Sequence, residues 1–139
     1  GTNRPGEALP AAPANAAVVE WLRYSEAMAA ADLVVCHGGH GTLMRALTAG
    51  CPVVVCPSVG DMAENAARVD WARLGVRLPR RYATPRGVRH AVRRALARPG
   101  LSERAAAVAR WIAANDAGER AAATLESWSQ TGALTRGTG

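Results

Sequence analysis

The chain has 139 residues, which fits one domain, and 49% of them are hydrophobic, which is enough for a buried core. The net charge is +6, and all 17 basic residues other than histidine are arginine. An arginine- and alanine-rich composition is typical of a GC-rich genome, so the charge alone identifies no partner. Aromatic residues make up 4% of the chain and do not alternate with the arginines, which argues against a stacking platform for single-stranded nucleic acid.

Three cysteines, Cys36, Cys51 and Cys56, lie in or beside two apolar segments. An odd number of cysteines in a buried setting predicts reduced thiols and a cytoplasmic location. Their spacing matches no paired zinc motif, so we expect no metal. No signal peptide or apolar segment of membrane-spanning length is visible. Because the chain begins with Gly1 rather than methionine, we expect a fragment of a longer protein.

The N-terminal part contains few regular elements. Residues 1–14 are rich in proline, glycine and alanine, which predicts an irregular loop. The apolar run VVEWL within residues 16–22 predicts a short strand. Ser25 is placed to cap the short helix that follows, which we expect to end near Ala31.

The next stretch is the most informative. The continuous apolar run at 33–36 predicts a strand covered on both faces. Three glycines follow within HGGHGT at 37–42, and Thr42 is placed to cap a helix that Gly50 ends. The apolar run at 53–56 predicts a second buried strand.

A polar loop then leads into another helix and strand. After the loop at 57–60, Asp61 and Glu64 have the spacing of a capping box, which predicts a helix start. Apolar side chains at helical spacing continue to Leu74. Residues 75–79 predict a further short strand.

Thr84 followed by Pro85 predicts a helix with threonine as its cap, and the helical pattern extends to Arg98. One face of this helix is apolar and is expected to pack, whereas we interpret the arginine-rich face as solvated surface. The apolar face carries Val88, Val92 and Leu96, and the other face carries His90 and the arginines at 86, 89, 93, 94 and 98.

Two more helices complete the chain. Ser102 is placed to cap the first, the second covers 117–128, and residues 131–139 are expected to form a flexible tail. The side chains expected to pack in these helices are Val108, Trp111, Ile112, Ala121, Leu125 and Trp128.

Strands that alternate with helices predict βαβ units, and hence an α/β fold with a Rossmann-like parallel sheet over residues 15–130. About four strands are visible, which is fewer than a free-standing doubly wound sheet has. The strand count therefore also indicates a fragment.

The glycine loop at 37–42 joins a buried strand to a helix, which is a general arrangement for binding anions. Free amide N–H groups and the helix dipole at such a start both favour negative charge. His37 directly follows the strand, at the carboxyl end where α/β proteins bind ligands, so we interpret it as a ligand contact. The segment therefore predicts a site for a phosphate-bearing ligand.

Four blocks carry a family resemblance: Trp21, HGGHGT at 37–42, ALTAGCPVVVCP at 46–57 and GDMAENAARV at 60–69. Together they resemble the C-terminal donor-binding domain of GT-B glycosyltransferases of the family-1 type, which includes UDP-glucuronosyl-, UDP-glucosyl- and macrolide glycosyltransferases. The resemblance spans residues 15–128. It implies that the chain is part of the C-terminal domain of a GT-B fold and binds a nucleotide-activated sugar.

The resemblance also assigns a role to each matching position. Trp21 matches the tryptophan that stacks on the nucleobase, and Asp61 and Met62 lie in the loop that binds the sugar. The residues that match the diphosphate-binding loop are His37, Gly39, His40, Gly41 and Thr42.

Two positions depart from the family pattern. Met62 stands where the family often has glutamine, so an amide that could bind a sugar hydroxyl is replaced by a thioether. Arg45 stands where UDP-glucose enzymes often carry a ribose-binding glutamate, and arginine cannot accept a hydrogen bond. The donor therefore stays open between a UDP- and a dTDP-sugar, including a deoxysugar.

The resemblance implies an inverting glycosyltransferase that moves the sugar to a hydroxyl of a small-molecule or lipid acceptor, without cofactor or metal. It places the catalytic base in an N-terminal acceptor domain, so this chain alone is expected to be inactive. Two alternatives stay open. One is another GT-B nucleotide-sugar enzyme, such as an epimerase or a lipid-linked glycosyltransferase. The other is a non-catalytic nucleotide- or nucleic-acid-binding module, although we expect no nucleic-acid partner.

Overall fold

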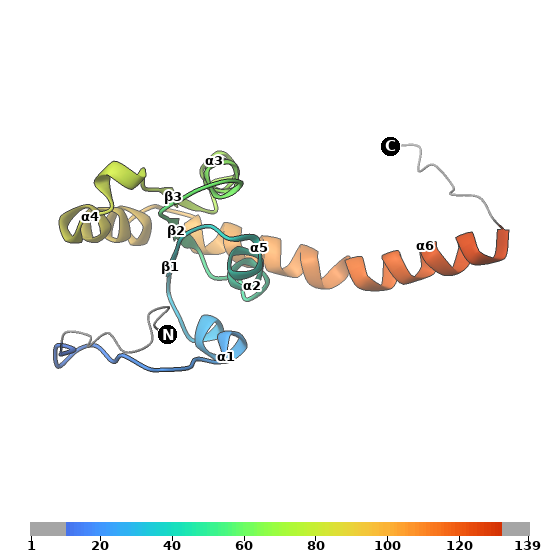
Figure 1. The fold of residues 1–139 in the computed structure, drawn as a ribbon, viewed down its shortest axis with the longest axis horizontal. Helices are drawn as coiled ribbons and strands as arrows, with labels where there is room; N and C mark the ends of the chain where they lie inside the picture. The colour runs from blue at the N-terminus through green and yellow to red at the C-terminus, as the bar shows by residue number, and fades with distance from the viewer. Residues whose placement is uncertain (1–10, 132–139) are drawn as a thin grey trace.

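Three parallel strands lie at the centre of the computed structural model, which describes residues 11–131 (Figure 1). They are β1 (Val34–Cys36), β2 (Val53–Val55) and β3 (Gly75–Arg77), in the order β1-β2-β3. The parallel sheet confirms the predicted α/β fold. Within residues 11–131 it has one strand fewer than the sequence predicted, because residues 16–22 form no strand.

The middle strand explains why the apolar runs are continuous. All three residues of β2 have no exposed surface. Val53 and Val55 contribute to a cluster with α2 and α3, whereas Val54 contributes to a second cluster with α4. Successive side chains of a strand point to opposite faces, so a strand covered on both faces has no place for a polar residue.

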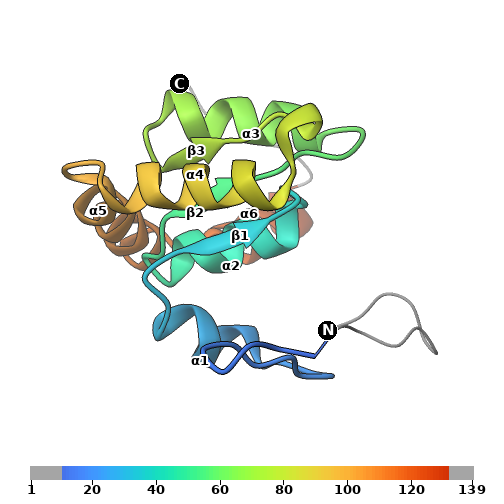
Figure 2. The ribbon, with the colours of Figure 1, turned by 90° about the vertical axis from the view of Figure 1, so that its left-hand side faces the viewer.

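Helices α2 (His40–Thr48) and α3 (Met62–Trp71) cover one face of the sheet, and α1 (Tyr24–Ala29) packs beside α2. Figure 2 shows α4 in front of the sheet and α2 behind it. The helical side chains buried in this first cluster come from α1, α2 and α3. They are Met28, Leu43, Ala46, Leu47, Ala66 and Val69.

Helix α4 (Pro85–Leu96) covers the opposite face, after the short 3-10 helix η1 (Arg80–Tyr82). Thr84 Oγ1 accepts a hydrogen bond from the Gly87 N–H at 3.1 Å, so the predicted threonine cap is confirmed. The most deeply buried side chains of α4 are two alanines, Ala91 and Ala95. Val88 and Val92 flank them, as predicted, but Leu96 is 58% exposed, so its predicted packing is wrong.

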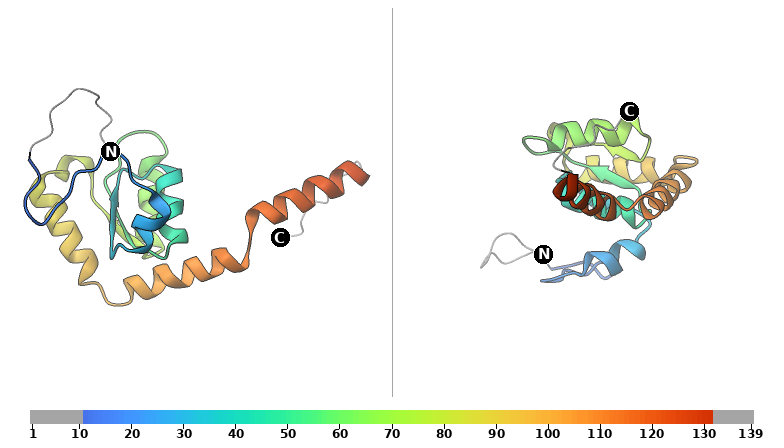
Figure 3. Two further views of the ribbon diagram at one scale, coloured as in Figure 1. Left: turned by 90° about the horizontal axis from the view of Figure 1, so that it is seen from below. Right: turned by 90° about the vertical axis from the view of Figure 1, so that its right-hand side faces the viewer.

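The chain then passes from α5 (Leu101–Ala114) to α6 (Ala117–Thr131). Helix α5 packs on α2, and Val108 and Ile112 reach the first core cluster, as predicted. Figures 1 and 3 show α6 projecting away from the sheet. Three α6 side chains expected to pack, Ala121, Leu125 and Trp128, are therefore exposed. Trp111 lies on the outer side of α5 and is also exposed, so the predicted packing of these four residues is wrong.

Two predictions near α1 and α5 are also wrong. Helix α1 begins after Arg23, and Ser25 lies inside it without a capping hydrogen bond. Helix α5 begins after Gly100, whose φ of +73° is a left-handed conformation, so Ser102 is not a cap either. In both helices the N-cap position is taken by another residue, the extended Arg23 or the left-handed Gly100. The serine that follows therefore lies inside the helix and cannot cap it.

The predicted strand at 16–22 is replaced by an irregular, exposed segment. Among residues 11–131 no strand pairs with it, and an extended segment without a partner has unsatisfied backbone groups that only water can bind. The predicted loop at 1–14 and tail at 131–139 lie largely outside the described residues. None of the helices in the described part of the chain is long and apolar enough to cross a membrane.

Candidate functional site

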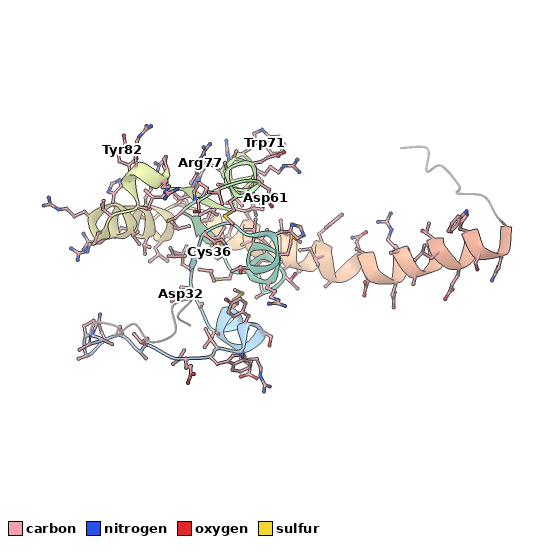
Figure 4. The ribbon with its side chains drawn as sticks, viewed as in Figure 1. Asp32, Cys36, Asp61, Trp71, Arg77 and Tyr82 are labelled. Carbon is pink, nitrogen blue, oxygen red and sulfur yellow. The ribbon has the colours of Figure 1, made fainter. Side chains whose placement is uncertain are left out.

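The carboxyl ends of all three strands lie at one edge of the sheet, because the strands are parallel. Figure 4 labels Cys36 at the end of β1, Asp61 after β2, and Arg77 at the end of β3. The loops that contain the glycine segment at 37–42 and Asp61 begin at this edge. Candidate ligand contacts from distant parts of the sequence are thus brought to one side of the molecule.

The start of α2 lies at this edge and presents free backbone donors. Gly39 is the N-cap residue, and no side chain caps the helix. The first helical N–H with a backbone acceptor is that of Leu43, which donates to the Gly39 carbonyl at 3.0 Å. The three preceding N–H groups, those of His40, Gly41 and Thr42, have no acceptor among residues 11–131.

Thr42 is therefore not the helix cap, and that prediction is wrong. It is the third residue of the helix, because the glycine at 39 already adopts the extended conformation of an N-cap. The result strengthens the case for an anion site. Three unsatisfied donors and the positive end of the helix dipole point to the same place.

His37 lies against this helix start. Its side chain is exposed, and a Cβ built on Gly39 would lie 2.7 Å from the His37 Nε2 atom. The imidazole ring thus folds back over the backbone of the N-cap. Gly38 makes this turn possible: its φ is +89°, and a Cβ there would lie 2.6 Å from Val55 Cγ1.

The loop after β1 is tied to the start of α3 by Asn65, a residue that the sequence analysis did not identify. Its Nδ2 donates to the Gly38 carbonyl at 3.0 Å and to Asp61 Oδ2 at 3.2 Å. Asn65 thus orients the Asp61 carboxylate relative to the glycine loop. The spacing of four residues from Asp61 to Asn65 on a helix was the available signal.

The predicted capping box at the start of α3 is wrong. Asp61 precedes the helix but makes no capping hydrogen bond, and its φ and ψ of −64° and −15° are already helical. Glu64 instead pairs with Arg68, with 2.6 Å between Oε1 and Nη2. Met62 is half-buried at the first position of the helix.

Beside α1 and α2 lies an open cleft of about 1060 Å³. Trp21, Tyr24, Thr42 and Arg45 all line it. The Arg45 guanidinium carbon lies 5.7 Å from the centre of the Tyr24 ring, and Trp21 is 72% exposed. Tyr24 lines the cleft as well, although no sequence pattern indicated a role for it.

The structure thus divides the predicted site residues into two groups. Trp21 and Thr42 share the cleft with Arg45, whereas the lining does not include His37, Asp61 or Met62. Thr42 connects the groups, because it lines the cleft and carries one of the free N–H groups of α2.

The three cysteines are free thiols, as predicted. Burial raises the pKa of each of them, Cys36, Cys51 and Cys56, so they stay protonated at neutral pH. For Cys36 a hydrogen bond from the backbone of Gly38 partly offsets the effect on the pKa. Within residues 11–131 no group of three or more histidine, cysteine, aspartate or glutamate side chains is arranged to hold a metal ion.

Comparison with known proteins places the chain among glycosyltransferases. A family model described as the erythromycin biosynthesis protein CIII-like, C-terminal domain, matches residues 2–127. The 4'-demethylrebeccamycin synthase of Lentzea aerocolonigenes is 36% identical over 105 residues, which are 76% of this chain and 25% of that protein. The NDP-glycosyltransferase YjiC of Bacillus subtilis (strain 168) is 32% identical over 128 residues, 92% of this chain and 33% of that protein.

Solved structures agree with these sequence relatives. The glycosyltransferase of kitacinnamycin matches with a TM-score of 0.77 and 31% identity, over 89% of this chain and 32% of that chain. The calicheamicin glycosyltransferase CalG4 matches with a TM-score of 0.72 and 30% identity, over 79% of this chain and 29% of that chain. The chain therefore spans between a quarter and a third of the length of these relatives. The resemblance inferred from the four sequence blocks is confirmed.

Proposed function

This chain belongs to the family of erythromycin biosynthesis protein CIII-like C-terminal domains, and we propose that it is the donor-binding part of an inverting glycosyltransferase. The donor that we propose is a nucleotide diphosphate sugar. The acceptor is a hydroxyl group of a small molecule or lipid that a further domain binds.

The observation that carries the proposal is the set of free N–H groups at the start of α2, beside His37. A diphosphate placed there accepts hydrogen bonds from the backbone at 40–42 and from the imidazole. The same groups stabilise the charge that develops on the diphosphate as it leaves the sugar, which lowers the barrier to transfer. No metal ion is needed for this role.

We place the nucleoside in the cleft beside α1. Trp21 is exposed there and has a free ring surface on which a base can stack. Arg45 has no acceptor atoms for ribose hydroxyls, but it can contact a phosphate oxygen. A stacking contact on the ring and an ion pair with phosphate suit uridine and thymidine diphosphates alike.

We place the sugar near Asp61, which Asn65 holds against the glycine loop. A carboxylate accepts hydrogen bonds from sugar hydroxyls, whereas the thioether of Met62 offers an apolar contact. A deoxysugar fits this combination better than a fully hydroxylated hexose.

Inversion follows from a single in-line displacement, in which a general base deprotonates the acceptor. We assign that base to the acceptor domain, so this chain binds the donor without turnover. Its three free thiols, all with raised pKa, fit a cytoplasmic enzyme.

Calorimetric titration of the chain with UDP and dTDP tests the proposal. We expect one of them to bind, and His37→Ala to weaken binding about tenfold through the loss of one charge-assisted contact. The control is Arg120→Ala on α6, an exposed side chain that lines neither cleft, which we expect to leave binding unchanged. Salt-steep binding of duplex DNA without nucleotide binding would instead support a nucleic-acid-binding module.

A further inference from the structure

A second cleft, of about 470 Å³, lies on the α4 side of the sheet, beyond the carboxyl end of β3. Its apolar part consists of Val76, Leu78 and Ala91, all of them buried. Its basic part comes from three segments, the end of β3, η1 and α4. These residues are Arg77, Arg81, Arg86, His90 and Arg94.

No carboxylate lines this cleft, and its arginines have no ion-pair partner among residues 11–131. The ion pairs of the described chain join Arg23 to Glu26 and Arg68 to Glu64, elsewhere in the fold. The cleft thus concentrates positive charge without a counter-charge. Its walls are of low dielectric, so the positive potential is focused toward a small anion.

Tyr82 adds an aromatic wall to the cleft. The guanidinium carbon of Arg81 lies 4.7 Å from the centre of the Tyr82 ring. This contact holds the arginine beside the cleft. Figure 4 shows Tyr82 on η1, above α4. An arginine fork beside an aromatic ring and an apolar floor suits a ligand with an oxyanion at one end and an apolar body at the other.

The volume of the cleft and the positions of its arginines favour a small ligand over a nucleic acid. Small-molecule sites measure roughly 300–1,000 Å³, and this cleft falls within that range. Arg89 and Arg93 of α4 are exposed but lie outside the lining. A nucleic-acid backbone would use these two arginines as well, whereas a ligand enclosed by the cleft would not.

We propose that this cleft binds a small organic phosphate monoester, with the phosphate on the arginines and the apolar body on Val76 and Leu78. The cleft lies on the opposite face of the sheet from α2, so it is distinct from the donor site. The proposal therefore does not rest on the identity of the donor.

The probe is phenyl phosphate, titrated into the 15N-labelled full chain and followed by NMR. We expect the amide signals of Gly87, His90 and Leu78 to shift with one common affinity. Phenol, which lacks the charge, and inorganic phosphate, which lacks the apolar body, should each bind more weakly. If phenyl phosphate shifts none of the three signals, or moves only the loop at 37–42, the proposal is wrong.

Two double variants with equal loss of charge sharpen the test. Arg86→Gln with Arg94→Gln removes two lining arginines, and we expect about a tenfold or greater loss of affinity for phenyl phosphate. Arg89→Gln with Arg93→Gln removes two arginines of the same helix outside the cleft. We expect less than about a twofold change, because these side chains do not line the cleft and, at a distance from the phosphate, their charges are screened by salt. All four side chains are exposed, so both variants should fold, which the spectrum checks directly.

Equal losses in the two double variants would mean diffuse electrostatic attraction and would overturn the proposal. Duplex DNA serves as the competing ligand. If it binds more tightly than phenyl phosphate and loses affinity in both variants, the arginine surface is a nucleic-acid interface instead.

Discussion

The anion sites that we propose on the two faces of the sheet differ in their donor groups. On the α2 face the donors are backbone N–H groups at a helix start, beside one histidine. On the α4 face the donors are arginine side chains from three separate segments. The first kind depends on the path of the backbone, and so on glycine. The second depends on which side chains the fold brings together, and it tolerates changes in the backbone better.

The largest effect is expected where the backbone path itself is changed. Gly38→Ala places a Cβ at φ +89° and 2.6 Å from Val55 Cγ1, which should cost about 3 kcal/mol of unfolding free energy. The matched control is Gly60→Ala, at φ +61° with open space around the Cβ, where we expect about 1 kcal/mol. Urea unfolding measures both. If both variants lose the same unfolding free energy, the positive φ alone, and not the contact with Val55 of β2, makes glycine necessary at position 38.

The next effect concerns the link between the glycine loop and α3. Asn65→Ala removes the hydrogen bonds to the Gly38 carbonyl and to Asp61, which should cost about 1–2 kcal/mol and weaken nucleotide-sugar binding. Asn115→Ala is the control, because that side chain also donates to a backbone carbonyl but lies at the C-terminal end of α5, and we expect it to leave nucleotide-sugar binding unchanged. If Asn65→Ala changes neither the unfolding free energy nor the affinity for the donor, Asn65 does not link the glycine loop to α3 in the way we infer.

A smaller effect is expected at the start of α4, which positions the arginine cleft. Thr84→Ala removes the hydrogen bond from the Gly87 N–H and should lower the unfolding free energy by about 1 kcal/mol. Ser102→Ala, at a predicted cap that makes no capping bond, should change it by less than about 0.5 kcal/mol. If Thr84→Ala also weakens phenyl phosphate binding while UDP binding is retained, the two faces are independent.

The smallest effect comes from the thiols, of which Cys36 packs on the α2 side and Cys56 on the α4 side. Burial raises their pKa, so as the pH rises the unfolded chain loses these protons before the folded one does. Stability is therefore fully present below the unfolded pKa, about 8.5, and is lost as the pH rises through the folded pKa. Unfolding curves between pH 7 and 10 should show this decline, and Cys36→Ser should reduce its slope. A stability that increases with pH over this range would contradict the shifts in pKa.

Most of the fold that supports the α2 face could be predicted from sequence. The runs at 33–36 and 53–56 are strands in the structure, and the glycine loop joins the first of them to α2. Errors occurred where two local signals competed. Thr42 and Asp61 are suited to cap, but the extended Gly39 and the helical backbone at 61 had already fixed the helix starts.

The α4 face was predicted less well. The arginines at 86, 89, 93 and 94 are exposed, as predicted, but the helical pattern contains no information about the arginines of η1 and the end of β3 that line the same cleft. Leu96 was expected to pack and is exposed, while two alanines are buried, since the helix lies close to the sheet there. The helical periodicity identified the apolar side of α4 but not which of its residues are buried against the sheet.

The sequence by itself determined most of the local elements and the glycine-rich path of the loop at 37–42, because glycine spacing and apolar periodicity act between near neighbours in the chain. Only the tertiary structure decided the rest. It placed Asn65 between two loops, brought Trp21 to the cleft beside Arg45, and gathered arginines of β3, η1 and α4 around one cavity. These arrangements depend on contacts between distant segments, which are fixed by packing against the sheet and leave no periodic signal in the sequence.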